Sequence, residues 1–208
     1  LSLVGSEMCI RDSLFACLIG SALLFYAGWE LIIVGLLCVL FAFLYTTGPY
    51  PLSYNGWGDV LVIVFFGFVP VGGTYYVQAL TWTSDTTVAS LICGLLIDTL
   101  LVVNNYRDRE ADARSGKRTV IVRFGEKFGR YLYLMLGVTA SLLCFWFFFE
   151  GHLFAALLPL LYLIPHVLTW RRMVQIHSGK KLNSILGETS RNMLLMGILL
   201  SIGFLIRH

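Results

Sequence analysis

Residues 89–118 read ASLICGLLIDTLLVVNNYRDREADARSGKR, an apolar run that gives way abruptly to a dense group of charges. The run before Asn104 contains a single acid, Asp98. A membrane-spanning helix needs roughly 17–25 apolar residues, and the segment 86–106 has that length. We therefore expect this stretch to cross the hydrocarbon of a bilayer and to place its charges at one membrane surface.

The composition of the whole chain also indicates a membrane protein. Of its 208 residues, 58% are hydrophobic and only 13% are charged, and the mean hydropathy is +0.80. A soluble domain carries about 25% charged residues, so this chain cannot cover its surface with polar groups. We expect membrane lipid to surround the protein, and we expect no nucleic acid among its partners.

The cysteines are isolated and form no C-x-x-C pair. This spacing favours neither a disulfide framework nor a zinc site, and we expect structural free thiols. The five cysteines are Cys9, Cys17, Cys38, Cys93 and Cys144.

Seven apolar segments succeed one another along the chain. They cover residues 14–28, 30–46, 58–80, 86–106, 128–149, 151–170 and 187–206. The first is short, and local thinning of a bilayer accommodates short spans. The prediction is an all-α, polytopic transmembrane helix bundle of about seven spans, which forms one domain over residues 14–208.

The first thirteen residues, LSLVGSEMCIRDS, differ in character from the rest of the chain. They lack the basic start, the apolar core and the small-residue cleavage site of a signal peptide. The string resembles a translated sequencing-adapter artefact. We expect residues 1–13 to be a non-native or disordered tail, and the native sequence to begin near Leu14.

The positive charges predict the orientation of the bundle. Eight of the fifteen Lys and Arg lie between Arg107 and Arg130, and more surround the loop between the last two segments. Counting segments puts both basic groups on one side, together with the loop YTTGPYPLSYNGWGD (45–59). Because cytoplasmic loops are enriched in Lys and Arg, we assign this side to the cytoplasm.

The charged stretch has the pattern of a magnesium and diphosphate site. Asn104, Asp108 and Asp112 are spaced four apart, so they form a stripe along one helix face. Mg²⁺ in proteins commonly takes one or two carboxylates and fills its remaining positions with water and substrate phosphates. The three side chains therefore form a hard-oxygen surface suited to Mg²⁺.

Basic residues come directly after the stripe. Gly116 can end the helix, and Lys117 and Arg118 come next, where their side chains could bind phosphate oxygens. Asn105 borders the stripe, and we expect it at the diphosphate as well. Spacing alone leaves an alternative open, in which the acids pair with neighbouring arginines on a solvated helix end.

Three motifs in the same order resemble one known family. NNYRDREADARSGKRTVIVRFG (104–125) resembles the second aspartate motif of the UbiA-type intramembrane aromatic prenyltransferases. The doubled Asn, the loop YTTGPYPLSYNGWGD and the closing segment KLNSILGETSRNMLL resemble the 1,4-dihydroxy-2-naphthoate polyprenyltransferase branch of menaquinone synthesis. The resemblance covers nearly everything after residue 14. It implies a bundle of nine spans around a central cavity, in a bacterial inner membrane.

The resemblance implies an enzyme that joins two substrates. Asp108 and Asp112 would be its catalytic pair and, with Asn104, would hold Mg²⁺ on a polyprenyl diphosphate, which would ionise there. The ring of 1,4-dihydroxy-2-naphthoate would attack the allylic cation, with loss of carbon dioxide and diphosphate, to give demethylmenaquinone. Tyr45, Tyr50 and Tyr54 are expected to line the aromatic pocket, although tyrosines also gather at bilayer interfaces for other reasons. The family's first motif, N-x-x-x-D, is not found in this sequence. We therefore expect a chain that lacks the first two spans and half of the metal site.

Other functions stay open at this point. The chain could prenylate another aromatic acceptor such as hydroxybenzoate, or it could be a transporter or a non-catalytic membrane protein. Asp98 is also undecided: an acid in mid-span costs about 2.5–3.5 kcal/mol on insertion scales and suggests function, but a neighbouring helix could satisfy it.

Overall fold

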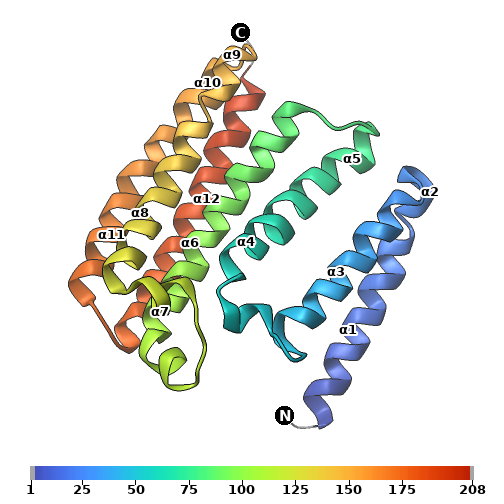
Figure 1. Ribbon diagram of the computed structural model, residues 1–208. Helices are drawn as coiled ribbons and strands as arrows, with labels where there is room; N and C mark the ends of the chain where they lie inside the picture. Colours follow the sequence, from blue (N-terminus) through green and yellow to red (C-terminus); the bar gives the residue numbers. More distant parts are fainter. Residues whose placement is uncertain (1–2, 207–208) are drawn as a thin grey trace.

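Helices make up every regular element of the protein between residues 3 and 206. The computed structural model describes these residues, apart from the side chains of residues 3–10 and 13. In chain order the elements are α1 (Leu3–Ser21), α2 (Leu24–Ala27), α3 (Glu30–Thr46), η1 (Leu52–Asn55), α4 (Gly58–Val62), the π-helix η2 (Ile63–Gly72), α5 (Gly73–Ala79), α6 (Ser84–Arg114), α7 (Val120–Phe124), α8 (Glu126–Leu143), α9 (Trp146–Phe149), α10 (Leu153–Leu157), η3 (Leu158–Tyr162), α11 (Leu163–Ile176), η4 (Lys180–Leu182) and α12 (Asn183–Leu205) (Figure 1).

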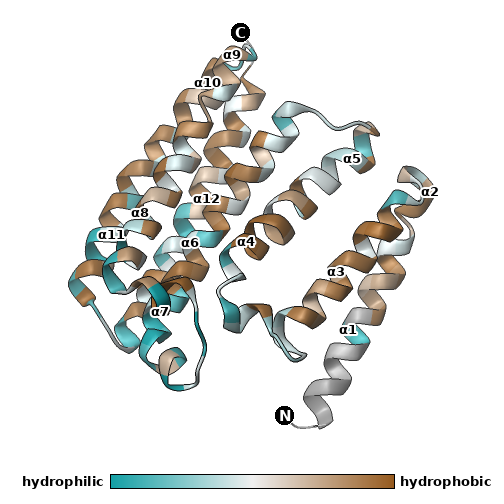
Figure 2. Ribbon diagram, in the orientation of Figure 1, coloured by the Kyte–Doolittle hydropathy of each residue, from teal (hydrophilic) through white to brown (hydrophobic). Residues whose placement is uncertain are grey.

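Five helical stretches are long and apolar enough to cross a membrane. They are Gly58–Ala79, Ser84–Arg114, Glu126–Phe149, Leu153–Ile176 and Lys180–Leu205. Two shorter apolar helices, Leu14–Ala27 and Glu30–Thr46, precede them. Figure 2 shows hydrophobic residues along the helices and hydrophilic ones gathered at the end of the bundle that carries α7. All seven predicted segments are therefore helical, and the prediction of an all-α polytopic membrane bundle is confirmed.

The start of the chain is part of the first helix. Residues 3–13, expected to be a non-native or disordered tail, are helical and run directly into the apolar residues of α1. Residues 1–2 lie outside the described residues. The foreign origin of this segment stays a prediction.

The described cysteines match the expected free thiols. Cys17, Cys38, Cys93 and Cys144 are all unpaired with one another, and Cys144 is buried. The side chain of Cys9 lies outside the described part of the chain.

α6 is the central helix of the bundle and packs against η2, α8 and α12. It begins at Thr83, whose Oγ1 accepts the backbone N–H of Thr86 at 3.2 Å and so caps the helix. Its 31 residues correspond to about 46 Å at 1.5 Å per residue, whereas the hydrocarbon core of a bilayer is about 30 Å thick. The charged C-terminal end of α6 therefore projects beyond the hydrocarbon.

Two glycines allow α6 and η2 to approach closely. A Cβ added to Gly67 would lie 2.5 Å from the carbonyl oxygen of Ser90 and 2.7 Å from the Cα of Gly94. Small residues at helix contacts let two backbones meet in this way, which is a common means of helix association in membranes. The contact fixes the position of the third span against the central helix.

Buried polar side chains join α8, α11 and α12 on the other side of the bundle. The hydroxyls of Tyr133 and Thr189 lie 3.0 Å apart, and Asn192 Nδ2 donates to Thr169 Oγ1 at 2.9 Å. His166 is fully buried and hydrogen-bonds the hydroxyl of Tyr162. Hydrogen bonds across helices satisfy polar groups that lipid cannot, so these contacts fix the three helices relative to one another.

We expect Gly67→Ala to destabilise the protein by about 1–3 kcal/mol, because the added methyl group overpacks the contact with α6. The check is the midpoint of thermal unfolding in detergent. Gly73→Ala is the matched control, since Gly73 lies in the same span and an added Cβ there meets no atom within 4 Å. Equal midpoints for the two variants would contradict the close contact.

Candidate active site

Three loops meet at the end of the bundle where α6 emerges (Figure 1). The backbone N–H of Arg118 donates to the carbonyl of Tyr54 at 2.8 Å, which joins the α6–α7 loop to the loop after α3. Arg107 Nη1 donates to Asn183 Oδ1 at 2.9 Å and joins α6 to the start of α12. The polar loops that were expected on one side of the membrane therefore lie at the same end of the protein.

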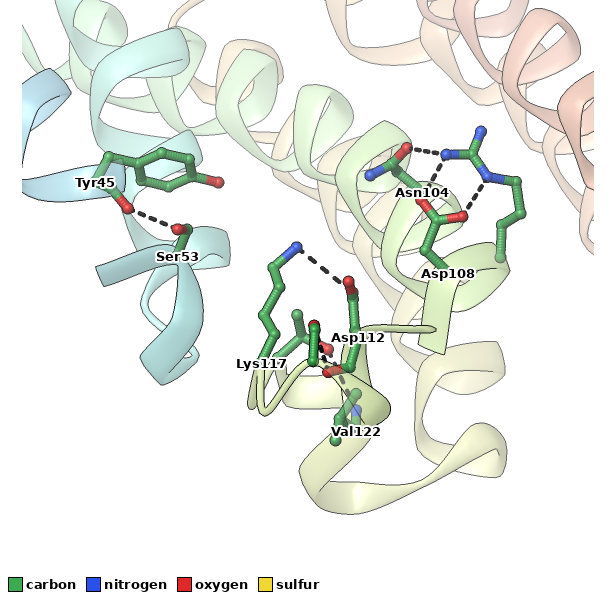
Figure 3. Close-up of polar contacts among 10 residues, drawn as sticks. Tyr45, Ser53, Asn104, Asp108, Asp112, Lys117 and Val122 are labelled. Atoms are coloured by element: carbon green, nitrogen blue, oxygen red, sulfur yellow. Dashed lines mark hydrogen bonds and ion pairs between the residues drawn. The ribbon is translucent and has the colours of Figure 1, made fainter. Parts of the chain in front are cut away.

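The predicted stripe on α6 surrounds a positive charge. Arg107 Nη2 donates to Asn104 Oδ1 at 2.7 Å and to Asp108 Oδ2 at 2.6 Å, and Arg107 Nε donates to Asp108 Oδ1 at 2.8 Å. Figure 3 shows the side chains of Asn104 and Asp108 turned toward this contact. The oxygen atoms of two stripe residues, Asn104 and Asp108, thus converge on one cation.

The second aspartate pairs with the predicted lysine. α6 ends in a turn at Gly116, which has a left-handed φ of 78°, and the Lys117 N–H donates to the carbonyl of Asp112 at 2.9 Å. This turn brings Lys117 Nζ to 3.4 Å from Asp112 Oδ2 (Figure 3). The side chains of Asp112 and Lys117 are 13% and 23% exposed, so the pair is largely shielded from solvent.

The alternative of a solvated, ion-paired helix end is correct only in part. Arg107 does pair with Asp108, but Arg109 pairs with Glu126 at the start of α8 instead. Glu126 also pairs with Arg130 and with His177, and its Oε1 accepts the Tyr106 hydroxyl. Arg109 therefore links α6 to α8. Each of the two aspartates pairs with one cation, Asp108 with Arg107 and Asp112 with Lys117.

A small polar pocket of about 80 Å³ lies beside the stripe. It collects four of the predicted site residues: Tyr45, Asn104, Asn105 and Lys117. Its remaining lining consists of Ser53, Gly56, Gly58, Asp59, Leu101 and Thr119. Ser53 Oγ donates to the carbonyl of Tyr45 at 2.6 Å, which fixes the loop wall of the pocket (Figure 3).

Other predicted residues lie outside this pocket. Asp108 and Asp112 are not among its lining residues, but Lys117, which pairs with Asp112, and Asn104, which shares Arg107 with Asp108, do line it. Tyr50 and Tyr54 are 57% and 43% exposed and contribute no side chain to it. Their predicted role at an aromatic pocket stays a prediction.

Arg118 is also placed apart from the pocket. Its side chain is exposed, and its contact with the neighbouring loop is made by the backbone. The two members of the predicted basic pair therefore differ: Lys117 enters the pocket and Arg118 does not.

Apolar grooves open from the polar pocket in two directions. One of about 510 Å³ runs between the third span, α6 and α12, and shares Leu101 and Asn104 with the pocket. Through Ile97 and Ser190 it continues into a groove of about 660 Å³ along α12. Another, of about 490 Å³, lies between α3 and the third span and shares Tyr45. A ligand with an anionic head and a long apolar tail matches this combination.

The donor set fits a divalent cation that is completed by a substrate. Asp108, Asp112 and Asn104 supply hard oxygen atoms. Asn104 and Asp108 contact Arg107, and Asp112 contacts Lys117. Among residues 3–206, no group of three or more His, Cys, Asp or Glu side chains forms a full metal site. Mg²⁺ held here would need oxygen atoms from water and from a bound diphosphate.

Sequence patterns missed part of this site. Asp59, Ser53 and Thr119 come from loops and helix starts whose contact with α6 is set by the tertiary fold. Asp59 ends the loop motif 45–59, but no charge or spacing rule connects it with Asn104. The doubled Asn is the clearest signal in the sequence that a second polar surface lies beside the stripe.

Comparison with known proteins gives the family of this chain. The sequence profile of the UbiA prenyltransferase family matches residues 7–202. The 1,4-dihydroxy-2-naphthoate octaprenyltransferase of Haemophilus influenzae is 36% identical over 180 residues, which cover 83% of this chain and 56% of that protein. The proteins of the same name in Mycobacterium tuberculosis and Escherichia coli are 40% and 39% identical, over 69% and 62% of this chain and 52% and 43% of their own lengths.

The chain spans about half the length of the curated relatives it matches. No solved structure matches it. The family profile nevertheless covers nearly all of the described residues, including the three motifs, the polar pocket and both aspartates. The chain is an integral membrane protein and belongs to the UbiA prenyltransferase family.

Proposed function

We propose that the protein transfers a polyprenyl group from a polyprenyl diphosphate to 1,4-dihydroxy-2-naphthoate, with release of diphosphate and carbon dioxide, giving demethylmenaquinone. The observation that carries this proposal is the position of the stripe and of Lys117 at the mouth of a long apolar groove. The relatives at 36–40% identity, which are named 1,4-dihydroxy-2-naphthoate octaprenyltransferases, support this choice of acceptor.

The charged end of α6 would receive the diphosphate. Asp108 and Asp112, with Asn104, would hold Mg²⁺, which when bound supplies positive charge against the negative charge that grows on the leaving diphosphate. Lys117 would bind a diphosphate oxygen directly, because its ammonium group already lies in the polar pocket. Asn105 is 3% exposed and lines the same pocket, where its amide can donate to a phosphate oxygen.

The grooves would receive the apolar tail and the ring. The groove along α6 and α12 has the apolar lining that an isoprenoid chain requires, and it excludes water from the reacting carbon. Tyr45 borders the polar pocket and the groove beside α3, so its ring face can stabilise an allylic cation. Tyr50 and Tyr54 were expected at the aromatic pocket and Arg118 at the diphosphate. The proposed arrangement gives their side chains no role, and these roles stay predictions.

The proposed location is the bacterial inner membrane, with the site at the cytoplasmic face. The basis is the concentration of Lys and Arg in the loops at the site end of the bundle. To test the side of the membrane, Arg118 is replaced by cysteine, and labelling of that cysteine by a membrane-impermeant thiol reagent is measured in intact cells.

We expect Asp108→Asn and Asp112→Asn each to lower the rate of diphosphate release by at least roughly 100-fold, because a charge ligand to the metal is lost. Diphosphate and prenylated naphthoquinol are measured over a Mg²⁺ titration in lipid vesicles. The matched control is Glu110→Gln, which removes one exposed acid from the same helix. If Asp108→Asn behaves like Glu110→Gln, or if the protein prefers 4-hydroxybenzoate as acceptor, the proposal is wrong in its site or in its substrate.

The two basic residues after the stripe should differ. Lys117→Met should raise the KM for polyprenyl diphosphate by about tenfold, since one charge-assisted hydrogen bond of roughly 1.5 kcal/mol is lost. Arg118→Met should change it by less than about twofold, because the Arg118 side chain is exposed. Initial rates at saturating acceptor provide the comparison, and a larger effect at Arg118 would reverse the assignment.

A further inference from the structure

Asp98 is a buried acid in the middle of α6 that the proposed function does not use. Its side chain is 1% exposed, and its Oδ1 has no hydrogen-bond partner among the described residues. None of the ion pairs formed by the described residues includes it. Unpartnered buried acids in membrane spans are costly, and such groups mark functional sites by default.

A second acid shares these properties at the polar pocket. Asp59 lies at the start of α4 and lines the pocket, and its Oδ1 is buried without a hydrogen-bond partner in the described structure. No positive side chain pairs with it among the described residues. The pocket therefore contains an acceptor atom that the protein itself leaves unused.

Packing between α6 and the third span places these two acids opposite each other. A Cβ added to Gly94 would lie 3.0 Å from the Ile63 Cα, and a Cβ added to Gly58 would lie 3.4 Å from Leu101 Cδ2. Asp98 on α6 lies between Gly94 and Leu101 along the chain. Asp59 on α4 lies between Gly58 and Ile63. Positions three and four apart share a helix face, and Asp59 is four residues before Ile63, while Asp98 is four after Gly94 and three before Leu101. The two carboxyl groups therefore face the same contact, and the charge of Asp59 acts on Asp98. We call Asp59 and Asp98 the carboxyl pair.

Tyr45 adds a hydroxyl to this cluster. Its Oη lies 3.5 Å from the position that a Cβ on Gly58 would occupy, and it interacts electrostatically with both members of the carboxyl pair. The carboxyl pair and this hydroxyl therefore gather at one contact between α4 and α6. The unpartnered Oδ1 of Asp59 can accept a hydrogen bond from a hydroxyl group of a ligand.

The size of the pocket selects the ligand group. A space of about 80 Å³ admits a hydroxyl group or a water but not a bicyclic aromatic ring. The groove of about 490 Å³ beside α3 adjoins the pocket at Tyr45 and is wide enough for such a ring, and Phe41 and Phe65 contribute to its apolar wall. An aromatic ring in the groove would therefore direct a ring hydroxyl toward Asp59.

We propose that Asp59 binds a ring hydroxyl of the aromatic acceptor and that Asp98, which faces the same contact, is a positioning residue for Asp59. This inference rests on the proposed function, because it takes the acceptor to be a hydroxylated naphthoate. It makes the carboxyl pair a determinant of acceptor specificity, separate from the aspartates at the end of α6.

The test compares two ligands that differ only in hydroxyl groups. Affinities for 1,4-dihydroxy-2-naphthoate and for 2-naphthoate are measured by titration calorimetry with the full chain in lipid nanodiscs. Asp59→Leu should weaken binding of the dihydroxy compound by tenfold or more and leave 2-naphthoate unchanged, because a site built for a hydroxyl loses only that contact. Asp98→Leu should show the same pattern with a smaller factor, and Asp98→Asn, which keeps a hydrogen-bonding group, should recover most of the loss.

Protein stability separates this role from a structural one. Removing an unpartnered buried polar group should leave the unfolding midpoint of the leucine variants equal or higher. Glu110→Gln is the control for loss of one negative charge on α6 and should change neither affinity. A leucine variant that loses affinity for both naphthoates equally, or for neither, overturns the proposal. A second result would also overturn the proposal. In it the wild type binds Na⁺ or Mg²⁺ and Asp59→Leu does not, while Asp59→Leu still prefers the dihydroxy compound to 2-naphthoate.

The outcomes also distinguish this inference from the proposed function. If wild type transfers the prenyl group and the variants discriminate hydroxyls as it does, the inference fails alone. If wild type binds both naphthoates but transfers nothing, the function fails and the affinities alone decide the inference. If wild type binds neither compound, both fail.

Discussion

The length of α6 relative to the bilayer is the constraint on which the rest of the structure depends. The part of the helix inside hydrocarbon must be apolar, and the part beyond it can carry charge without that cost. The transition falls at Asn104, so the stripe begins where lipid tails end. The turn at Gly116 then returns the chain to the helix end, and the loops from α3 and α12 close over the same region. A polar pocket next to apolar grooves results from this arrangement.

Much of the fold could be predicted because membrane helices give strong one-dimensional signals. Each predicted apolar segment is helical, since hydrocarbon leaves the backbone few alternatives. Several helices extend six or more residues beyond the predicted limits, as α6 does to Arg114, because polar residues outside the hydrocarbon can continue a helix. The stripe and Lys117 were also predictable, because residues four apart on one helix and a glycine turn need no tertiary information. The gathering of the basic loops at one end of the bundle could be predicted by counting spans.

The rest of the site depends on contacts between distant segments. Nothing in the sequence around Asp59 indicates that it faces α6, because that contact requires the glycines of two helices to meet. Tyr50 and Tyr54 belong to the same aromatic motif as Tyr45, yet only Tyr45 reaches the pocket. Tyr45 lies on α3, whereas the other two tyrosines lie beyond the end of that helix. Arg107 looked like one of several surface arginines, and its place between Asn104 and Asp108 depends on side-chain geometry.

The π-helical winding of η2 has a consequence for how the third span is compared with other chains. A π turn closes an i to i+5 hydrogen bond where an α turn closes i to i+4, so it takes up additional residues for each rotation. A helical wheel drawn with a constant angle through residues 58–79 therefore assigns the wrong side to residues after Ile63, Gly67 among them. Deleting one residue there can be absorbed by tightening a π turn to an α turn, so the residues up to Ala79 keep their side of the helix. The same deletion in an α-helical span would rotate every later residue by about 100°.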